Sequence, residues 1–338
     1  MRFKPSLIAL SVLALCTSVH AEDKVLNLYS ARHYQTDEAL YADFTRDTGI
    51  RINRIEGKED ELLERIRNEG ANSPADVLLT VDAARLAKAH ELGLFVPVRS
   101  KVLEARIPAH LRTEDWFSFS TRARVIVYNK ESITPDSVRN YEDLAKPALK
   151  GKVCSRSGSH PYNLSLGAAI IAHQGDAKAE EWARGLVANF ARSPKGGDTD
   201  QIKAVAAGEC QVALANTYYV ARLMRSTKPD EVKLMEKVGV VWPNQATTGT
   251  HINVSGGGVL KHAPHREAGI RFLEYLASDK AQRYFADGNN EWPVVEQVKV
   301  SNPALDALGK FKPDTLPVRN LAMYQVKAQM IYDRTGYR

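Results

Sequence analysis

The chain has 338 residues, of which 46 are Lys or Arg and 40 are Asp or Glu, so its formal net charge at pH 7 is +6. This positive charge is mild and forms no basic block interleaved with aromatic residues, which argues against nucleic acid as a partner. No segment after the N-terminal region is apolar enough to cross a membrane. A chain of this length usually folds as two domains.

Residues 1–21 have the pattern of a secretory signal. Arg2 and Lys4 precede an apolar run over residues 7–15, and residues 19–21 (VHA) form a small-residue cleavage site of the A-x-A kind. The run is shorter than the roughly 20 residues that a membrane-spanning helix needs. We therefore predict removal of this segment and a periplasmic location, with an uncleaved anchor as the alternative.

Short β-rich runs and helical patterns alternate along the rest of the chain. The strand candidates are residues 24–30, 50–57, 75–81, 124–129, 152–157, 210–216 and 238–243. The helical candidates are residues 36–48, 59–69, 83–92, 175–189 and 266–287. The first three helical patterns each end at a glycine, which is a common stop signal for a helix. The alternation predicts an α/β fold with largely parallel sheets.

Two segments have the character of crossings between two lobes. SFSTRARVIVYNK (118–130) resembles a strand that runs from one lobe to the other, and ATTGTHINVSGGG (246–258) suits a Gly/Thr/Ser-rich return through a hinge. We expect an N-terminal lobe of residues 22–123 plus about 248–290, and a C-terminal lobe of residues 124–247 plus about 291–338.

Three of the predicted strands end beside tyrosines. The residues are Tyr34, with His33 before it, after NLYS; Tyr162 after KVCSRS; and the pair Tyr218-Tyr219 after VALAN. In open α/β sheets, ligands bind beyond the carboxyl ends of the strands. Each tyrosine taken singly is more often a packing residue, but together they indicate that four phenols and an imidazole meet in one cleft between the lobes.

A set of phenol oxygens suits a metal ion of high charge. The pKa of a free phenol is about 10, so several phenols lose their protons at neutral pH only beside a strong cation. Ferric iron prefers charged oxygen donors, and tyrosine is an iron ligand in catalase. Softer metals would bring cysteines or a histidine cluster, and Ca²⁺ or Mg²⁺ would bring several carboxylates. Three phenolates balance Fe(III), and Arg122 or Arg124 is a candidate for balancing a fourth.

Two further groups of residues are assigned to the scaffold rather than to the site. Histidines that show no ligand pairing are His160, His173, His251, His262 and His265. Cys154 and Cys210 both lie in predicted strands of a chain that we expect to be exported. A disulfide between them and two buried thiols are both open interpretations.

At these residues the chain resembles the periplasmic ferric-iron-binding proteins of ABC importers, within the type II solute-binding superfamily. The matching segments are LNLYSARHYQTDEALYADFTRDTGI, ADVLLTVDAARL, STRARVIVYNK, GKVCSRSGSHPYNLSL, the NTYY pair and GTHINVSGGGVLKHAPH. They extend across most of the mature chain. NTYY with RHY upstream is fairly specific to these proteins, whereas the two-lobed fold is shared much more widely.

The resemblance implies a set of iron ligands and one residue behind them. The implied ligands are His33, Tyr34, Tyr162, Tyr218 and Tyr219. Arg122 resembles a position that lies beside the metal in this family. Another branch of the family uses a glutamate after the third strand together with phosphate or another anion. Val81 stands at that position here, which argues against a glutamate ligand and makes a required synergistic anion doubtful.

The sequence bears on three possible functions. The preferred one is a monomeric binding protein that captures Fe(III), free or as a chelate, and delivers it to an inner-membrane ABC permease. The alternative is a binding protein for an organic cation such as a polyamine or thiamine, held by cation–π contacts. The tryptophans that would favour this alternative, Trp116, Trp182, Trp242 and Trp292, do not lie at the strand ends. An enzyme is disfavoured because G-x-S-x-G, P-loop and HExxH motifs are absent.

Overall fold

The computed structural model describes residues 24–32, 34 and 36–338. The predicted signal segment, residues 1–21, and His33 lie outside the described residues. Among the described residues, nine strands form one mixed sheet in the order β2-β1-β3-β8-β4-β6-β5, and β7 and β9 also pair with β4. The strands are β1 (Val25–Ser30), β2 (Arg51–Glu56), β3 (Val77–Thr80), β4 (Phe117–Asn129), β5 (Val153–Cys154), β6 (Val212–Asn216), β7 (Val238–Val241), β8 (Ile252–Val259) and β9 (Trp292–Pro293).

Each of the predicted strands is present, and two of them differ most in extent. The candidate at residues 124–129 is only the second part of β4, which begins at Phe117. The candidate at residues 152–157 shortens to Val153–Cys154 because the chain leaves the sheet there and turns toward a helix. The sequence alternation therefore locates the strands well and their ends less well.

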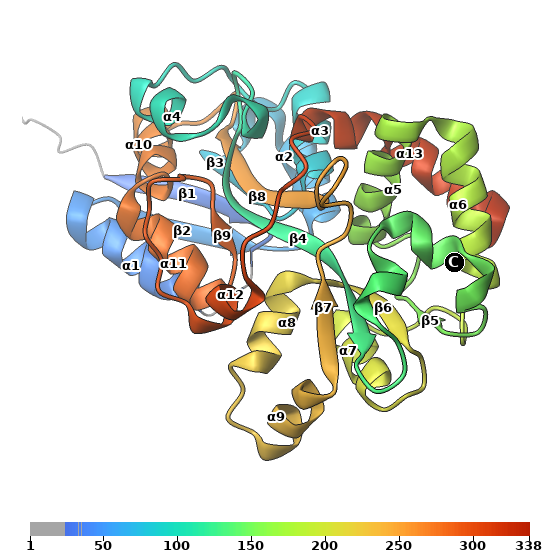
Figure 1. Cartoon of the computed structure of the whole chain (residues 1–338). Helices are drawn as coiled ribbons and strands as arrows, with labels where there is room; N and C mark the ends of the chain where they lie inside the picture. The colour runs from blue at the N-terminus through green and yellow to red at the C-terminus, as the bar shows by residue number, and fades with distance from the viewer. Residues whose placement is uncertain (1–23, 33, 35) are drawn as a thin grey trace, which may run out of the picture.

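Strand direction divides the sheet into three parts. Parallel pairs lie at its two ends, where β1 pairs with β2 and β3 and where β5 pairs with β6. The antiparallel pairs between the described strands all involve β4 or β8. The expectation of largely parallel sheets therefore holds at the ends and not at the centre. Figure 1 shows the cause: β4 passes from the part that contains β1–β3 to the part that contains β6.

The return crossing predicted at residues 246–258 is strand β8 for more than half of its length. Its glycines lie where β3 and β4 approach it from both sides. A Cβ atom on Gly256 would lie 2.4 Å from the carbonyl oxygen of Phe117 on β4. Glycine is therefore required there for close packing of strands.

Helices lie around the part of the sheet that contains β1–β3 and around the part that contains β6 (Figure 1). They are α1 (Asp37–Thr48), α2 (Glu59–Glu69), α3 (Ala83–Glu91), α4 (Lys101–Arg106), α5 (Pro161–Gln174), α6 (Asp176–Ala188), α7 (Asp198–Ala206), α8 (Thr217–Met224), α9 (Pro229–Glu236), α10 (Arg266–Leu276), α11 (Asp279–Asn289), α12 (Pro303–Leu308) and α13 (Val318–Thr335). The single helix predicted at residues 266–287 is wrong, because α10 and α11 are separate. Ser278 ends the continuity by accepting a hydrogen bond from the Ala281 backbone N–H as the N-cap of α11.

The buried apolar side chains form one large cluster on the N-terminal side and two main clusters on the C-terminal side. Along β4, Ala123 belongs to the first cluster, while Val125 and Ile126 belong to the other two. Helix α13 also contributes to both sides, with Leu321 in the first cluster and Ile331 in the second. Two long elements therefore connect the halves of the molecule.

Cys154 on β5 and Cys210 just before β6 form a disulfide, with their Cα atoms 5.7 Å apart. Both residues are buried. The bond joins the two strands that lead toward Tyr162 and toward the Tyr218-Tyr219 pair.

None of the helices among the described residues is long and apolar enough to cross a membrane.

Candidate metal site

Three chain segments bring tyrosines to the same region from different elements. Tyr34 follows β1, and Tyr162 is the second residue of α5. Tyr218 and Tyr219 lie in the first turn of α8, which begins directly after β6. The prediction of a tyrosine pair beyond a strand end thus holds, but the pair belongs to a helix.

The tyrosines are close together in space. Tyr162 Oη and Tyr218 Oη share a hydrogen bond of 2.8 Å. The rings of Tyr218 and Tyr219 are 4.2 Å apart between centroids and tilted by 32°. These three residues and Tyr34 line one cavity of about 620 Å³. The structure therefore brings together the four phenols that the sequence analysis selected.

Tyr34, Tyr162 and Tyr218 are protonated in the metal-free protein at neutral pH, because the pKa of each is raised. Burial raises the pKa of Tyr34 and of Tyr218 well above the usual value. Burial also raises the pKa of Tyr162, to about 12, against an opposing effect of Arg122. Tyr162 further raises the pKa of Tyr34, and Tyr34 that of Tyr218, because each negative charge disfavours the next. Ionising the set needs a cation in the cavity.

Arg122 on β4 is a buried cation with spare hydrogen-bonding capacity. Its guanidinium carbon lies 5.8 Å from the centroid of the Tyr162 ring. Nη1 donates to Ser255 Oγ at 3.1 Å, whereas Nε and Nη2 have no hydrogen-bond partner among the described residues. Glu291 Oε1 is 3.8 Å from Nη1 and also lacks a hydrogen-bond partner in this part of the chain. Unsatisfied buried donors of this kind require an explanation, and a ligand site beside them supplies one.

The second arginine that the sequence analysis named, Arg124, also lies behind Tyr162. Its guanidinium carbon is 6.0 Å from the centroid of the Tyr162 ring. Unlike Arg122, it is held by Asp198 and Asn163 through hydrogen bonds of 2.6 Å and 2.8 Å. Arg124 therefore adds positive charge near the phenols while both of its terminal nitrogens are hydrogen-bonded, and its Nε has no partner among the described residues.

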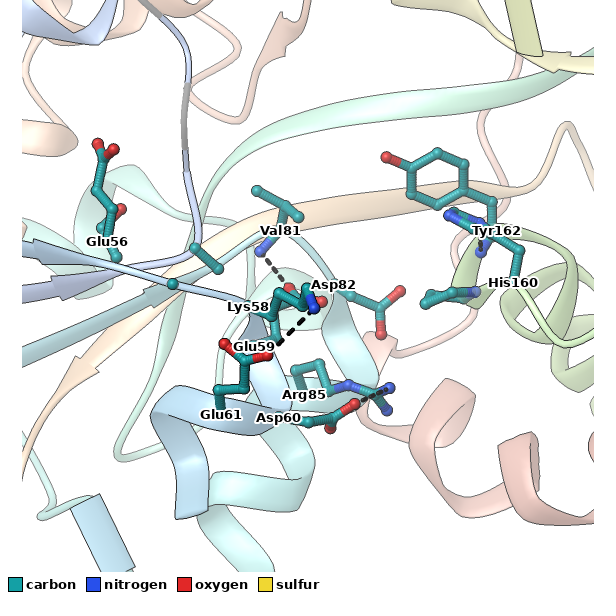
Figure 2. A pocket seen from close by; sticks show the side chains of 14 residues that line it. Glu56, Lys58, Glu59, Asp60, Glu61, Val81, Asp82, Arg85, His160 and Tyr162 are labelled. Atoms are coloured by element: carbon teal, nitrogen blue, oxygen red, sulfur yellow. Dashed lines mark hydrogen bonds and ion pairs between the residues drawn. The ribbon is translucent and has the colours of Figure 1, made fainter. Parts of the chain in front are cut away.

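Val81 separates the tyrosine cavity from a larger neighbour. Figure 2 shows this second pocket, of about 790 Å³, with Val81 and Glu59 on one side and His160 and Tyr162 on the other. The backbone N–H of Val81 donates to Glu59 Oε1 at 2.8 Å. Burial, with a contribution from Asp82, raises the pKa of Glu59 to about 7. This carboxylate could not be predicted from the sequence, because its approach to Val81 depends on how α2 packs.

His160 is nearer the site than predicted. It is the N-cap of α5, where Nδ1 accepts from the Tyr162 backbone N–H at 3.3 Å, and it lines both cavities. Burial, with the charge of Arg156 next, lowers the pKa of His160 to about 3, so its ring is neutral. Of the other histidines, His251 is buried. Its Nε2 shares a hydrogen bond with Ser165 Oγ, away from the tyrosine cavity.

The donor set narrows the choice of ligand. Among the described residues, no group of three or more His, Cys, Asp or Glu side chains could hold a metal ion. The tyrosine oxygens that line the cavity are donors that suit a hard trivalent ion. The described lining of the tyrosine cavity also contains no tryptophan. Trp242 instead stacks on Phe311 with centroids 4.1 Å apart.

The mixed sheet, the crossing strands and the cavity between the two halves define a solute-binding protein of the two-lobed type II fold. Residues 72–312 match the family described as bacterial extracellular solute-binding proteins, and the chain belongs to this family. The members of this family are binding proteins, which supports the prediction that the chain is not an enzyme.

The chain is similar to known proteins in both sequence and structure. Iron uptake protein A1 of Synechocystis sp. is 50% identical over 319 residues, which cover 94% of this chain and 88% of that protein. The Trichodesmium IdiA/FutA structure, in complex with iron and citrate ligands, is 52% identical with a TM-score of 0.89, covering 93% of this chain and 100% of that one. The ferric binding protein from Campylobacter jejuni is 43% identical with a TM-score of 0.87, covering 93% and 100%.

Proposed function

We propose that this protein binds Fe(III) through Tyr34, Tyr162, Tyr218 and Tyr219, with His33 as a further ligand, and delivers the iron for uptake. The observation that carries the proposal is the gathering of four phenols on one cavity, at positions drawn from three separate segments. Relatives about half identical over nearly the whole chain are named for iron uptake and for complexes with iron, which supports the same cargo.

The charges around the cavity suit a ferric ion. Three phenolates neutralise Fe(III), and a fourth leaves one negative charge. Arg122, whose free N–H groups lie behind Tyr162, is the proposed source of compensation. Because the position used by a glutamate in another branch is Val81, we propose no carboxylate ligand from there, and a synergistic anion is not needed for charge balance.

Delivery completes the proposed function. We propose a periplasmic monomer that hands iron to an inner-membrane ABC permease after removal of residues 1–21. The lobes would be residues 22–123 with about 248–290, and residues 124–247 with about 291–338, closing around the ion by a hinge motion. The family of extracellular solute-binding proteins supports the location and the transport role.

The proposal is tested by loading the purified mature protein with ferric citrate, desalting it, and recording its visible spectrum. We expect a phenolate-to-iron charge-transfer band and about one iron per chain. Tyr219→Phe is expected to weaken both the band and the affinity. The control is Tyr284→Phe, which removes a phenol bonded to Asp43 outside the cavity. A colourless, iron-free wild-type protein would contradict the proposal.

The organic-cation alternative has no observation in its favour. Cation–π recognition would gain from tryptophan, and none lines the described part of the cavity. Calorimetry with a polyamine and with ferric citrate on the same preparation separates the two functions. Heat from the polyamine alone would favour the alternative.

A further inference from the structure

A buried cluster of charges, which we call the Asp198 cluster, lies behind the tyrosines on the C-terminal side. It consists of Asp198, Arg124 and Arg156. Asp198 is the first residue of α7 and is fully buried. The sequence analysis did not single it out, and no role in ligand binding follows from its sequence context.

Asp198 accepts hydrogen bonds from three different segments. Its Oδ2 accepts from Arg124 Nη1 at 2.6 Å and from the backbone N–H of Asn216 at 2.7 Å. Its Oδ1 accepts from Arg156 Nη1 at 3.1 Å. Hydrogen bonds to a charged acceptor are stronger than neutral ones, and a buried carboxylate needs such partners. One side chain therefore ties β4, β6 and the segment after β5 to the start of α7.

Each of these segments leads to a proposed iron ligand. Asn216 is the last residue of β6, two residues before Tyr218. Arg156 lies in the segment that connects β5 to α5, the helix of Tyr162. Arg124 also donates from Nη2 to Oδ1 of Asn163, the neighbour of Tyr162, at 2.8 Å. The carboxylate of Asp198 thus fixes the mutual position of Tyr162 and the Tyr218-Tyr219 pair.

The cluster also sets the charge that Tyr162 experiences. The guanidinium carbons of Arg156 and Arg124 lie 5.1 Å and 6.0 Å from the centroid of the Tyr162 ring. Asp198 compensates one of these two positive charges. Without it, two uncompensated cations would face the ring in a buried setting, where charges interact strongly.

We infer that Asp198 is a positioning residue of the iron site, holding Tyr162 in register with the Tyr218-Tyr219 pair and balancing the arginines that face Tyr162. It contacts no proposed ligand oxygen and acts through Arg124, Arg156 and Asn216. The inference rests on the proposed function, because its effect is exerted on the phenols that would bind iron.

The first test is Asp198→Asn in the full mature protein loaded with ferric citrate. The change keeps the shape and removes the charge. We expect iron affinity to fall by roughly 10–100-fold, as for the loss of other partners behind metal ligands. We also expect the charge-transfer band to move to shorter wavelength, because the uncompensated arginines stabilise the electrons of the Tyr162 phenolate.

The matched control is Asp76→Asn. Asp76 is also fully buried and accepts from two backbone N–H groups, those of Asn27 at 2.7 Å and His265 at 2.6 Å. It precedes β3, at the opposite end of that strand from Val81. A loss of stability alone would be similar in both variants, whereas the band position should change only for Asp198→Asn.

A second pair of variants keeps the test decisive if Asp198→Asn does not fold. Arg156→Met removes one of the cations facing Tyr162 and should move the band to longer wavelength, opposite to Asp198→Asn. Its control is Arg192→Met, since the Arg192 and Arg156 side chains are both 13% exposed and Arg192 pairs with Glu209 instead.

The outcomes separate this inference from the proposed function. A wild-type protein without a charge-transfer band defeats the proposed function itself. A wild-type band that is unchanged in wavelength in a folded Asp198→Asn variant overturns the inference alone. If that variant does not fold, an Arg156→Met band at the wild-type wavelength overturns it.

Discussion

Two arginine clusters flank the tyrosine cavity, and they differ in how closely a carboxylate approaches the arginines. In the Asp198 cluster, the carboxylate binds both arginines at 2.6 Å and 3.1 Å. The second cluster consists of Glu291, Arg32 and Arg122. Glu291 Oε2 is 3.4 Å from Arg32 Nη1, and Glu291 Oε1 is 3.8 Å from Arg122 Nη1. Glu291 accepts its shorter bond, of 2.9 Å, from the hydroxyl of Ser120.

The difference teaches what each cluster contributes. Both oxygens of Asp198 accept close hydrogen bonds, which rigidifies the surroundings of the C-terminal-side tyrosines, although Nε of Arg124 and Nε of Arg156 have no hydrogen-bond partner among the described residues. The looser cluster leaves N–H groups of Arg122 without partners in the described part of the chain, next to the Tyr162 ring. We interpret the Asp198 cluster as positioning the proposed ligands. We interpret Arg122, in the looser cluster, as a source of positive charge that compensates the phenolates when iron is bound.

The largest expected effect is a fall in iron affinity as pH falls. If this effect is absent, the roles given to the two clusters do not hold. Neither cluster lowers the phenol pKa values below normal; burial keeps those of Tyr34, Tyr162 and Tyr218 raised. Protons must therefore leave when iron binds, and affinity should fall as pH falls, by about tenfold per pH unit for each proton released. Competition against a chelator of known proton dependence, measured from neutral to mildly acidic pH, gives the slope. An affinity independent of pH would show that the phenols are not the ligands.

The next effect is the loss of Tyr162, the proposed ligand that lies beside the Asp198 cluster. Tyr162→Phe removes a phenol oxygen that bonds to Tyr218 at 2.8 Å. We expect iron affinity to fall by more than roughly 100-fold. That value is the upper range for losing a residue that hydrogen-bonds to a metal ligand without binding the metal itself. Equilibrium competition measures it, with Tyr284→Phe as the control. An affinity within a fewfold of wild type would remove Tyr162 from the ligand set.

Arg122→Met sharpens the contrast between the clusters. It should lower iron affinity by roughly 10–100-fold, because the positive charge of Arg122 beside Tyr162 is lost. Glu291 keeps Ser120 and Arg32 as partners, so the metal-free protein should lose less stability than Asp198→Asn, for which breaking a buried pair costs on the order of 3–5 kcal/mol. Urea unfolding of both variants gives the comparison. Equal losses of stability would mean that the two clusters do not differ in role.

The smallest effect is acid sensitivity on the C-terminal side. Burial, with Arg124 next, lowers the pKa of His251 to about 3 from about 6.5. A neutral buried imidazole gives stability above pH 6.5 that is lost as pH falls, by about 2 kcal/mol at pH 5. Comparing wild type with His251→Asn by urea unfolding at pH 7 and pH 5 measures this term, with His262→Asn, at an exposed position, as control. The same pH dependence in all three proteins would exclude His251 as its source.

Some of this architecture is readable from the sequence, because the signals are local. The strands before Tyr34 and Tyr218 are short apolar runs, and strand ends converge in α/β sheets. The break between α10 and α11 at Ser278 was not predicted, because the periodic apolar pattern continues across residues 266–287.

The rest of the site depends on contacts between segments far apart in sequence. Asp198 meets Arg124 across 74 positions, and Ser120 meets Glu291 across 171. No local pattern distinguishes these residues from solvated charges. The sequence named Arg122 and Arg124 together as candidates for balancing charge, and only the family resemblance favoured Arg122. The N–H groups of Arg122 without partners among the described residues could be found only from the fold that surrounds it.

The most direct test counts the phenolates formed for each iron bound. Near-ultraviolet difference absorption of the wild-type protein during ferric titration reports tyrosine ionisation. We predict that the signal of Tyr34, Tyr162, Tyr218 and Tyr219 rises together and stops at one iron per chain. Iron bound with no tyrosine ionisation would contradict the account.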